Sequence, residues 1–156
     1  MKKRLLLTAT VAITAFIFIH SLMPADDSQQ ESDSFFILFE QIMKFLHLPN
    51  LFNEGSIRKL AHFIEFSVFG FFLSSTVHAY CGFKNQIFKI LFFLLAVPVI
   101  DETLQYFSDG RSSAVKDVLL DFSGCLFGLS ILFLITVIVS KSTKMQRTVS
   151  NNAVKK

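Results

Sequence analysis

Apolar segments long enough to cross a lipid bilayer dominate this chain. They cover residues 5–23, 57–80, 86–107 and 114–140. A helix needs about 20 predominantly apolar residues to span the hydrocarbon core of a bilayer. The composition agrees, because 52% of the residues are hydrophobic and 17% are charged, whereas about 25% of the residues in soluble domains are charged. We therefore expect an all-α integral membrane protein in which residues 1–140 form one domain of four transmembrane helices.

Basic residues mark the segment ends that we expect on the cytoplasmic side. They occur at residues 2–4, at Lys84 and Lys89 around the second connection, and repeatedly in residues 141–156. Because Lys and Arg accumulate in cytoplasmic loops, this pattern predicts a multi-pass protein of the cell membrane with both termini inside. We expect residues 141–156 to form a basic, disordered cytoplasmic tail.

The first segment has a second interpretation, since a basic start followed by an apolar run also describes a signal peptide. Met23 and Ala25 would occupy the positions before the cleavage site where two small residues are wanted. We therefore expect the segment to be retained. The topology downstream is the same in either case.

A shorter stretch with helical periodicity follows the polar connection after the first segment. Between residues 35 and 48, apolar residues recur at helical spacing with polar residues between them. About 14 residues are too few to span a bilayer, so we expect a short amphipathic helix in the outer interface. Packing of this helix against the other segments is the alternative.

Polar residues are concentrated at the expected outer ends of the last three segments. They are Arg58, His62 and Glu65 on the second, Asp101, Glu102 and Gln105 on the third, and Asp117 and Asp121 on the fourth. On each helix most of them share one face, although Glu102 is turned from Asp101 by about a quarter circle. Gly124 and Gly128 form a small-xxx-small pair that lets a neighbouring helix approach. Because lipid offers no polar partner, we expect the polar faces to meet in one site in the outer half of the membrane.

This polar cluster can be structural or functional. Ion pairs such as Arg58 with Asp117, or His62 with Asp101, could simply hold the helices together. However, the carboxylates outnumber the well-placed bases, and unneutralised carboxylates at membrane depth favour a bound cation, a proton or a cationic ligand group.

Two chemical alternatives have weaker support. A metal site would have His62, Glu65, Asp101 and Asp121 as its ligands. No dense ligand motif supports such a site, so we assign no metal and no cofactor. The available serines lie outside the GxSxG context of a nucleophile, and a helix N-cap is the better interpretation of Ser112 or Ser113. Whether the protein is an enzyme stays open.

The polar stretches resemble the VanZ-like family of small bacterial membrane proteins. They are RKLAHFIEF at 58–66, DETLQYF at 101–107, GRSS at 110–113, DVLLDFSG at 117–124 with Gly128, and HSLMP at 20–24. The resemblance covers residues 5–140, and these motifs follow one another in the order expected for the family. The family is named for a component of glycopeptide-antibiotic resistance clusters that lowers sensitivity to teicoplanin. The resemblance therefore implies a role in the bacterial cell envelope.

Teicoplanin carries a lipid tail and cell-wall precursors carry a polyprenyl tail. We therefore expect a site at head-group depth that binds or acts on a membrane lipid or lipid-linked envelope molecule, with no nucleic acid as partner. Residues expected to contact the ligand are Arg58, Lys59, Gln105, Arg111 and Asp117. Candidates for catalysis are His62, Glu65, Asp101, Glu102 and Asp121. A small ion- or proton-coupled transporter, or an assembly partner without a site of its own, are the alternatives.

Overall fold

The computed structural model describes residues 2–24, 54–83, 86–108, 110–111 and 113–154, together with residues 37, 40, 41, 44 and 45. Within this part, the long elements are α1 (Lys2–Ser21), α3 (Glu54–Cys81), α4 (Ile87–Tyr106) and α5 (Val115–Val154). No strand occurs among these residues. The all-α prediction is therefore confirmed for the described residues.

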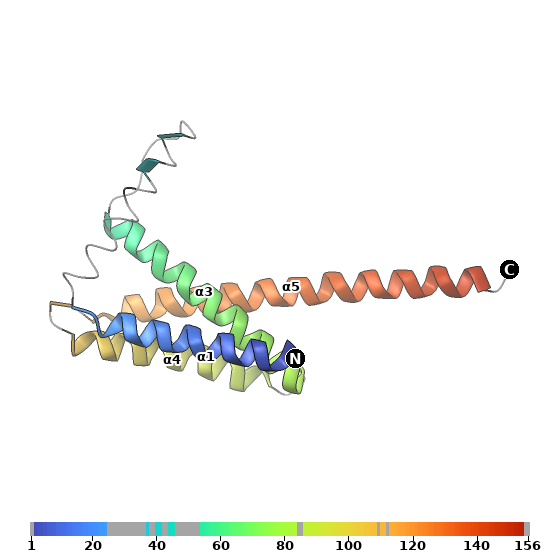
Figure 1. The fold of residues 1–156 in the computed structure, drawn as a ribbon, viewed down its shortest axis with the longest axis horizontal. Coiled ribbons are helices and arrows are strands. Elements are labelled where there is room, and N and C mark those ends of the chain that lie inside the picture. Colours follow the sequence, from blue (N-terminus) through green and yellow to red (C-terminus); the bar gives the residue numbers. More distant parts are fainter. Residues whose placement is uncertain are drawn as a thin grey trace.

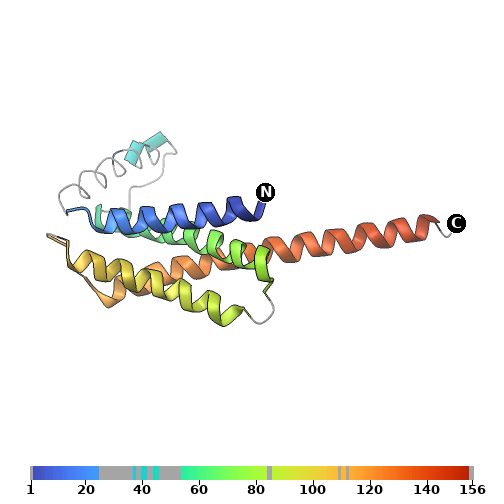
Figure 2. The ribbon, with the colours of Figure 1, turned by 60° about the horizontal axis from the view of Figure 1, so that its bottom comes forward.

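The helices pack as a bundle in which consecutive helices run in opposite directions (Figures 1 and 2). Helix α3 contacts each of the other three helices and packs most extensively against α5. The C-terminal ends of α1 and α4 lie beside the N-terminal ends of α3 and α5 (Figure 1). We call this the polar end of the bundle, because it carries His62, Asp101 and Asp121. Helix α5 continues well past the other helices at the opposite end (Figure 2).

Glycines on α5 set its distance from α3. A Cβ atom at Gly128 would collide with the carbonyl oxygen of Ser67, and one at Gly124 would lie 2.6 Å from the carbonyl oxygen of Phe63. The predicted close approach at the small-xxx-small pair is therefore confirmed, and the neighbouring helix is α3. Because the approach begins one turn after Asp121, it also fixes the position of Asp121 relative to His62.

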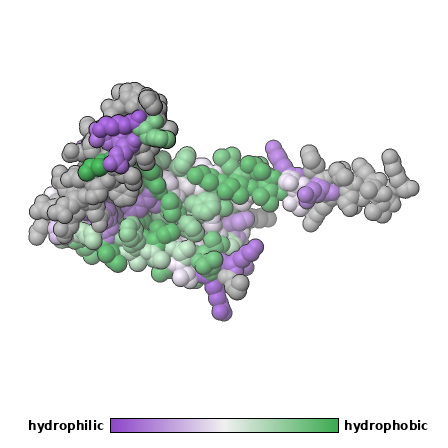
Figure 3. Space-filling model, turned by 45° about the horizontal axis from the view of Figure 1, so that its top comes forward, coloured by the Kyte–Doolittle hydropathy of each residue, from purple (hydrophilic) through white to green (hydrophobic). Residues whose placement is uncertain are grey.

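Three helices are long and apolar enough to cross a membrane. Their apolar stretches are Lys2–Ser21, Gly55–Cys81 and Val115–Thr143. Helix α4 is not among them, because it carries Lys89, Asp101 and Glu102. Figure 3 shows apolar side chains along the middle of the bundle and polar ones near its two ends. This surface is typical of a membrane protein, whose apolar sides face lipid.

Two further expectations concern the segments outside the bundle. Helix α5 runs to Val154, so the prediction of a disordered tail is wrong up to that residue. The chain has no glycine or proline between Gly128 and Val154, so nothing interrupts the propagation of the helix. The expected amphipathic helix over residues 35–48 lies largely outside the described residues. Of the residues described there, Lys44 and Glu40 form an exposed ion pair of 3.2 Å.

Candidate functional site

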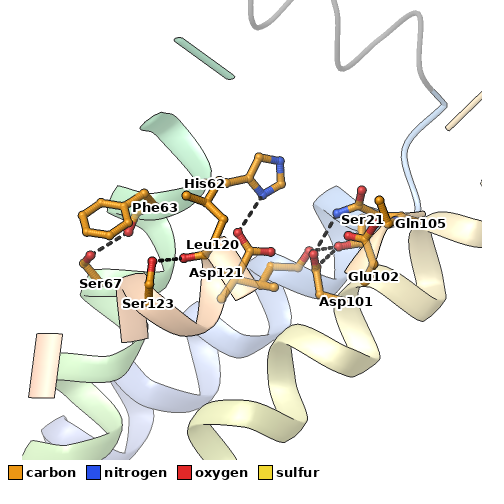
Figure 4. A network of polar contacts seen from close by, with 12 residues as sticks. Ser21, His62, Phe63, Ser67, Asp101, Glu102, Gln105, Leu120, Asp121 and Ser123 are labelled. Atoms are coloured by element: carbon orange, nitrogen blue, oxygen red, sulfur yellow. Dashed lines mark hydrogen bonds and ion pairs between the residues drawn. The ribbon is translucent and has the colours of Figure 1, made fainter. Parts of the chain in front are cut away.

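Each of the four helices contributes one residue to a polar layer at the polar end. The residues are Ser21 of α1, His62 of α3, Asp101 of α4 and Asp121 of α5, and their side chains converge (Figure 4). The side chains of Ser21, Asp101 and Asp121 are almost completely buried. The expectation that polar residues of the last three segments meet is therefore confirmed for His62, Asp101 and Asp121. The structure adds α1, which the expected site did not include.

Hydrogen bonds hold both carboxylate oxygens of Asp101. The hydroxyl of Ser21 donates to Oδ1, and Nε2 of Gln105 donates to Oδ2 at 2.8 Å. Gln105 lies four residues after Asp101, as the shared helical face predicted. Two donors on one carboxylate fix its orientation, so Asp101 is a preorganised group rather than a mobile one.

Asp121 is held differently. Its Oδ1 lies 4.0 Å from Nδ1 of His62, beyond hydrogen-bonding distance. One ligand-type atom each from His62, Asp101 and Asp121 lies within 4.8 Å of the others. The predicted pair of His62 with Asp101 is therefore a three-membered cluster in which Asp121 is the partner nearest to His62.

A cavity of about 240 Å³ opens beside this cluster. The residues that line it are Gly55, Arg58, Lys59, His62, Glu102, Gln105, Gly110, Arg111, Asp117, Leu120 and Asp121. All five residues expected to contact a ligand are among them, together with three of the five candidates for catalysis. Guanidinium and ammonium groups thus share one cavity with carboxylates, an arrangement that can bind a ligand bearing both an anion and a cation.

An apolar layer lies immediately inside the polar one. Each of its residues is four positions from a member of the polar layer along the same helix: Ile17, Phe66, Val97 and Cys125. All four are buried, and Phe69, Ile90 and Leu94 continue this core. The polar layer therefore borders a packed apolar core, which restricts the site to one end of the bundle.

Glu102 has a structural contact that the sequence did not predict. Although expected to turn away from the cluster, it is only 4% exposed and lines the cavity. Its Oε1 accepts a hydrogen bond of 2.6 Å from the backbone N–H of Ala114. The carbonyl of Ala114 accepts the first backbone bond of α5, from Asp117. Ala114 is therefore the N-cap, so the assignment of that role to Ser112 or Ser113 is wrong.

Glu65 lies outside the cavity wall. Its Oε1 is buried, and no described residue forms a hydrogen bond with it. Asp101 and Arg111 are the charged groups that act on it electrostatically. Of the candidates for catalysis, Glu65 and Asp101 do not line the cavity, and Glu65 is the one that also lies outside the polar layer.

Ser21 is the residue that sequence reasoning missed. A signal was present, because Thr10, Thr14 and Ser21 lie on one face of α1 and give it small polar side chains. Thr10 contacts α3 through a hydrogen bond of 2.8 Å to Thr76. A sequence search for charged residues alone overlooks such a face.

The sequence matches a known family over most of its length. The model of the family described as VanZ/LLP1 matches residues 6–137, which include every residue of the polar layer. The chain belongs to the VanZ/LLP1 family. No curated protein and no solved structure shows a significant match. The resemblance found in the sequence motifs is therefore confirmed, and the chain is a VanZ-like membrane protein.

Proposed function

We propose that this VanZ-like protein binds the anionic head group of a lipid-linked cell-envelope molecule in the cavity at its polar end. The observation that carries the proposal is a cavity at the polar end that is lined by both basic and acidic side chains. Arg58, Lys59 and Arg111 would meet phosphate or carboxylate oxygens, for which guanidinium groups are suited by their forked donors. Asp117 would meet an amine on the same ligand.

The depth of the site in the membrane supports a lipid as the source of that head group. We infer that α4 is the fourth span, since its 20 residues correspond to about 30 Å of helix. Its acidic residues Asp101 and Glu102 are buried within the bundle and thus face no lipid. With four spans and the basic N-terminus inside, the polar end faces the outer leaflet.

Membership of the VanZ/LLP1 family suggests a consequence for the cell. The family's namesake lowers sensitivity to teicoplanin, a glycopeptide with a lipid tail. A protein that binds tailed envelope molecules at the outer leaflet would either engage such an antibiotic directly or change the lipid-linked target that the antibiotic meets. The cavity chemistry is the same in both cases.

A transporter is less well supported. Coupled movement of ions or protons requires polar groups that extend through the bundle. Here the apolar layer of Ile17, Phe66, Val97 and Cys125 follows the polar layer directly. A purely structural role is also less well supported, because packing alone gives no reason for a cavity lined by Arg58, Lys59 and Asp117.

Binding of a polyprenyl phosphate to the full-length protein in lipid nanodiscs tests the proposal. We expect Arg58→Gln to weaken binding at least about tenfold, because a charge-assisted hydrogen bond contributes roughly 1.5–3 kcal/mol. Lys89→Gln is the matched control, since Lys89 is an exposed base at the opposite end of α4. Equal affinity of the Arg58 and Lys89 variants, or no saturable binding by the wild type, would contradict the proposal.

A further inference from the structure

Three residues beside the cavity have the composition of a metal site. They are His62, Asp101 and Asp121, from α3, α4 and α5, and their ligand-type atoms lie within 4.8 Å of one another. Two ligands of a tetrahedral zinc ion lie about 3.4 Å apart, given metal–ligand distances near 2.1 Å. Small side-chain rotations therefore bring all three atoms to coordination distance.

Asp121 is buried among groups of its own charge. Its side chain is 2% exposed, and its Oδ1 lies 4.0 Å from Nδ1 of His62. Asp101, Glu102, Asp117 and Glu65 all oppose a negative charge there. Burial of a carboxylate among other carboxylates is costly. A cation coordinated by Asp121 offsets this cost.

Asp101 is oriented by hydrogen-bond donors, as metal-binding carboxylates commonly are. Ser21 and Gln105 each donate to one of its oxygens, which leaves further lone pairs free to coordinate an ion. Such outer-shell hydrogen bonds orient the ligands of metal sites. Ser21 and Gln105 belong to different helices, so metal binding would also join α1 to the cluster.

We propose that His62, Asp101 and Asp121 bind one divalent transition-metal ion, with Zn²⁺ preferred over Mg²⁺. One imidazole nitrogen with two carboxylate oxygens suits Zn²⁺ or Mn²⁺, whereas Mg²⁺ takes oxygen ligands only. Three protein ligands leave a coordination position toward the cavity. The inference rests on the cavity of the proposed function, where that open position would accept an oxygen of the bound phosphate or carboxylate.

Titration of the chelator-treated full-length protein in detergent with Zn²⁺ or Mg²⁺ alone tests the site. We expect one Zn²⁺ per chain and weaker binding of Mg²⁺. Loss of an outer-shell partner typically costs about 10–100-fold in metal affinity. The Zn²⁺ affinity of Ser21→Ala should therefore decrease by about that factor, and the Zn²⁺ affinity of Asp121→Asn should decrease by more. Asp117→Asn is the matched control, because Asp117 lines the cavity but lies outside the cluster. It should keep a saturable site.

A spectroscopic variant covers the case in which Asp121→Asn fails to fold. In a background with Cys81→Ser and Cys125→Ala, Asp121→Cys loaded with Co²⁺ should show a thiolate-to-cobalt charge-transfer band, and Asp117→Cys should not. Absence of saturable Zn²⁺ binding by the folded wild type, or equal signals from positions 117 and 121, would overturn the metal site. The metal titrations contain no lipid, so failure to bind metal would not count against head-group binding. Loss of head-group binding, in turn, would not count against the metal site.

Discussion

His62 of α3 and Asp121 of α5 face each other with 4.0 Å between Nδ1 and Oδ1, at the point where these two helices begin their closest approach. The glycines that follow Asp121 permit this approach, and they therefore position the pair. Packing and the polar site thus depend on the same few turns of helix.

Replacement of Gly128 by alanine tests this dependence. The added Cβ would collide with the backbone of Ser67 on α3, so the helices must separate. Overpacking of this kind typically costs about 1–3 kcal/mol. We expect Gly128→Ala to lower the thermal stability of the detergent-solubilised protein, and Ser130→Ala, on an exposed position of α5, to leave it unchanged. Equal melting temperatures would show that the approach of α3 and α5 is looser than described.

The contact of Glu102 with α5 predicts a graded effect of substitution. Glu102→Gln keeps an acceptor for the N–H of Ala114, whereas Glu102→Ala removes it and leaves a helix start uncapped. Loss of a hydrogen bond to a charged group costs roughly 1.5–3 kcal/mol. Thermal unfolding should rank the wild type first, the glutamine variant second and the alanine variant last. An alanine variant as stable as the wild type would remove the structural role of Glu102.

The hydrogen bond between Ser21 and Asp101 predicts a short-range crosslink between α1 and α4. In a background with Cys81→Ser and Cys125→Ala, cysteines at 21 and 101 should crosslink with a short reagent. Phe16→Cys with Asp101→Cys is the control, because Phe16 is exposed on α1, and should not crosslink. The gel mobility of the product also reports whether α1 stays attached. A crosslink absent at 21 and 101 in properly inserted protein would separate α1 from the site.

The proposed four spans predict the location of three reporter fusions. Fusions after Gly82 and after Asn152 should be active only with a cytoplasmic reporter, because basic residues flank both positions. A fusion after Gln30 should be active only with an external reporter. External activity at Gly82 would contradict the orientation, and external activity at Asn152 with a cytoplasmic Gly82 would contradict the fourth span.

Much of this arrangement could be predicted because lipid restricts what polar residues can do. His62, Asp101 and Asp121 stand out in apolar segments, and helical spacing gives their faces. Ser21 could not be found in the same way, since an uncharged serine is common in membrane helices and its partner lies 80 positions along the chain. The role of Glu102 depends on the path of the connection into α5, which helical periodicity does not describe. The length of α5 does not follow from composition, because a polar, basic sequence suits an exposed helix as well as a disordered tail.

The central claim is that the polar layer serves a ligand rather than packing alone. Asp121→Asn tests it most directly, since the substitution keeps the shape of the side chain and removes only its charge. Teicoplanin and vancomycin sensitivity should be compared in a deletion strain that expresses the wild type, Asp121→Asn or Ser130→Ala, with membrane abundance measured in each. We expect equal abundance of all three proteins and loss of teicoplanin protection in Asp121→Asn alone, with vancomycin sensitivity unchanged. Full teicoplanin protection by Asp121→Asn at wild-type abundance would contradict the account.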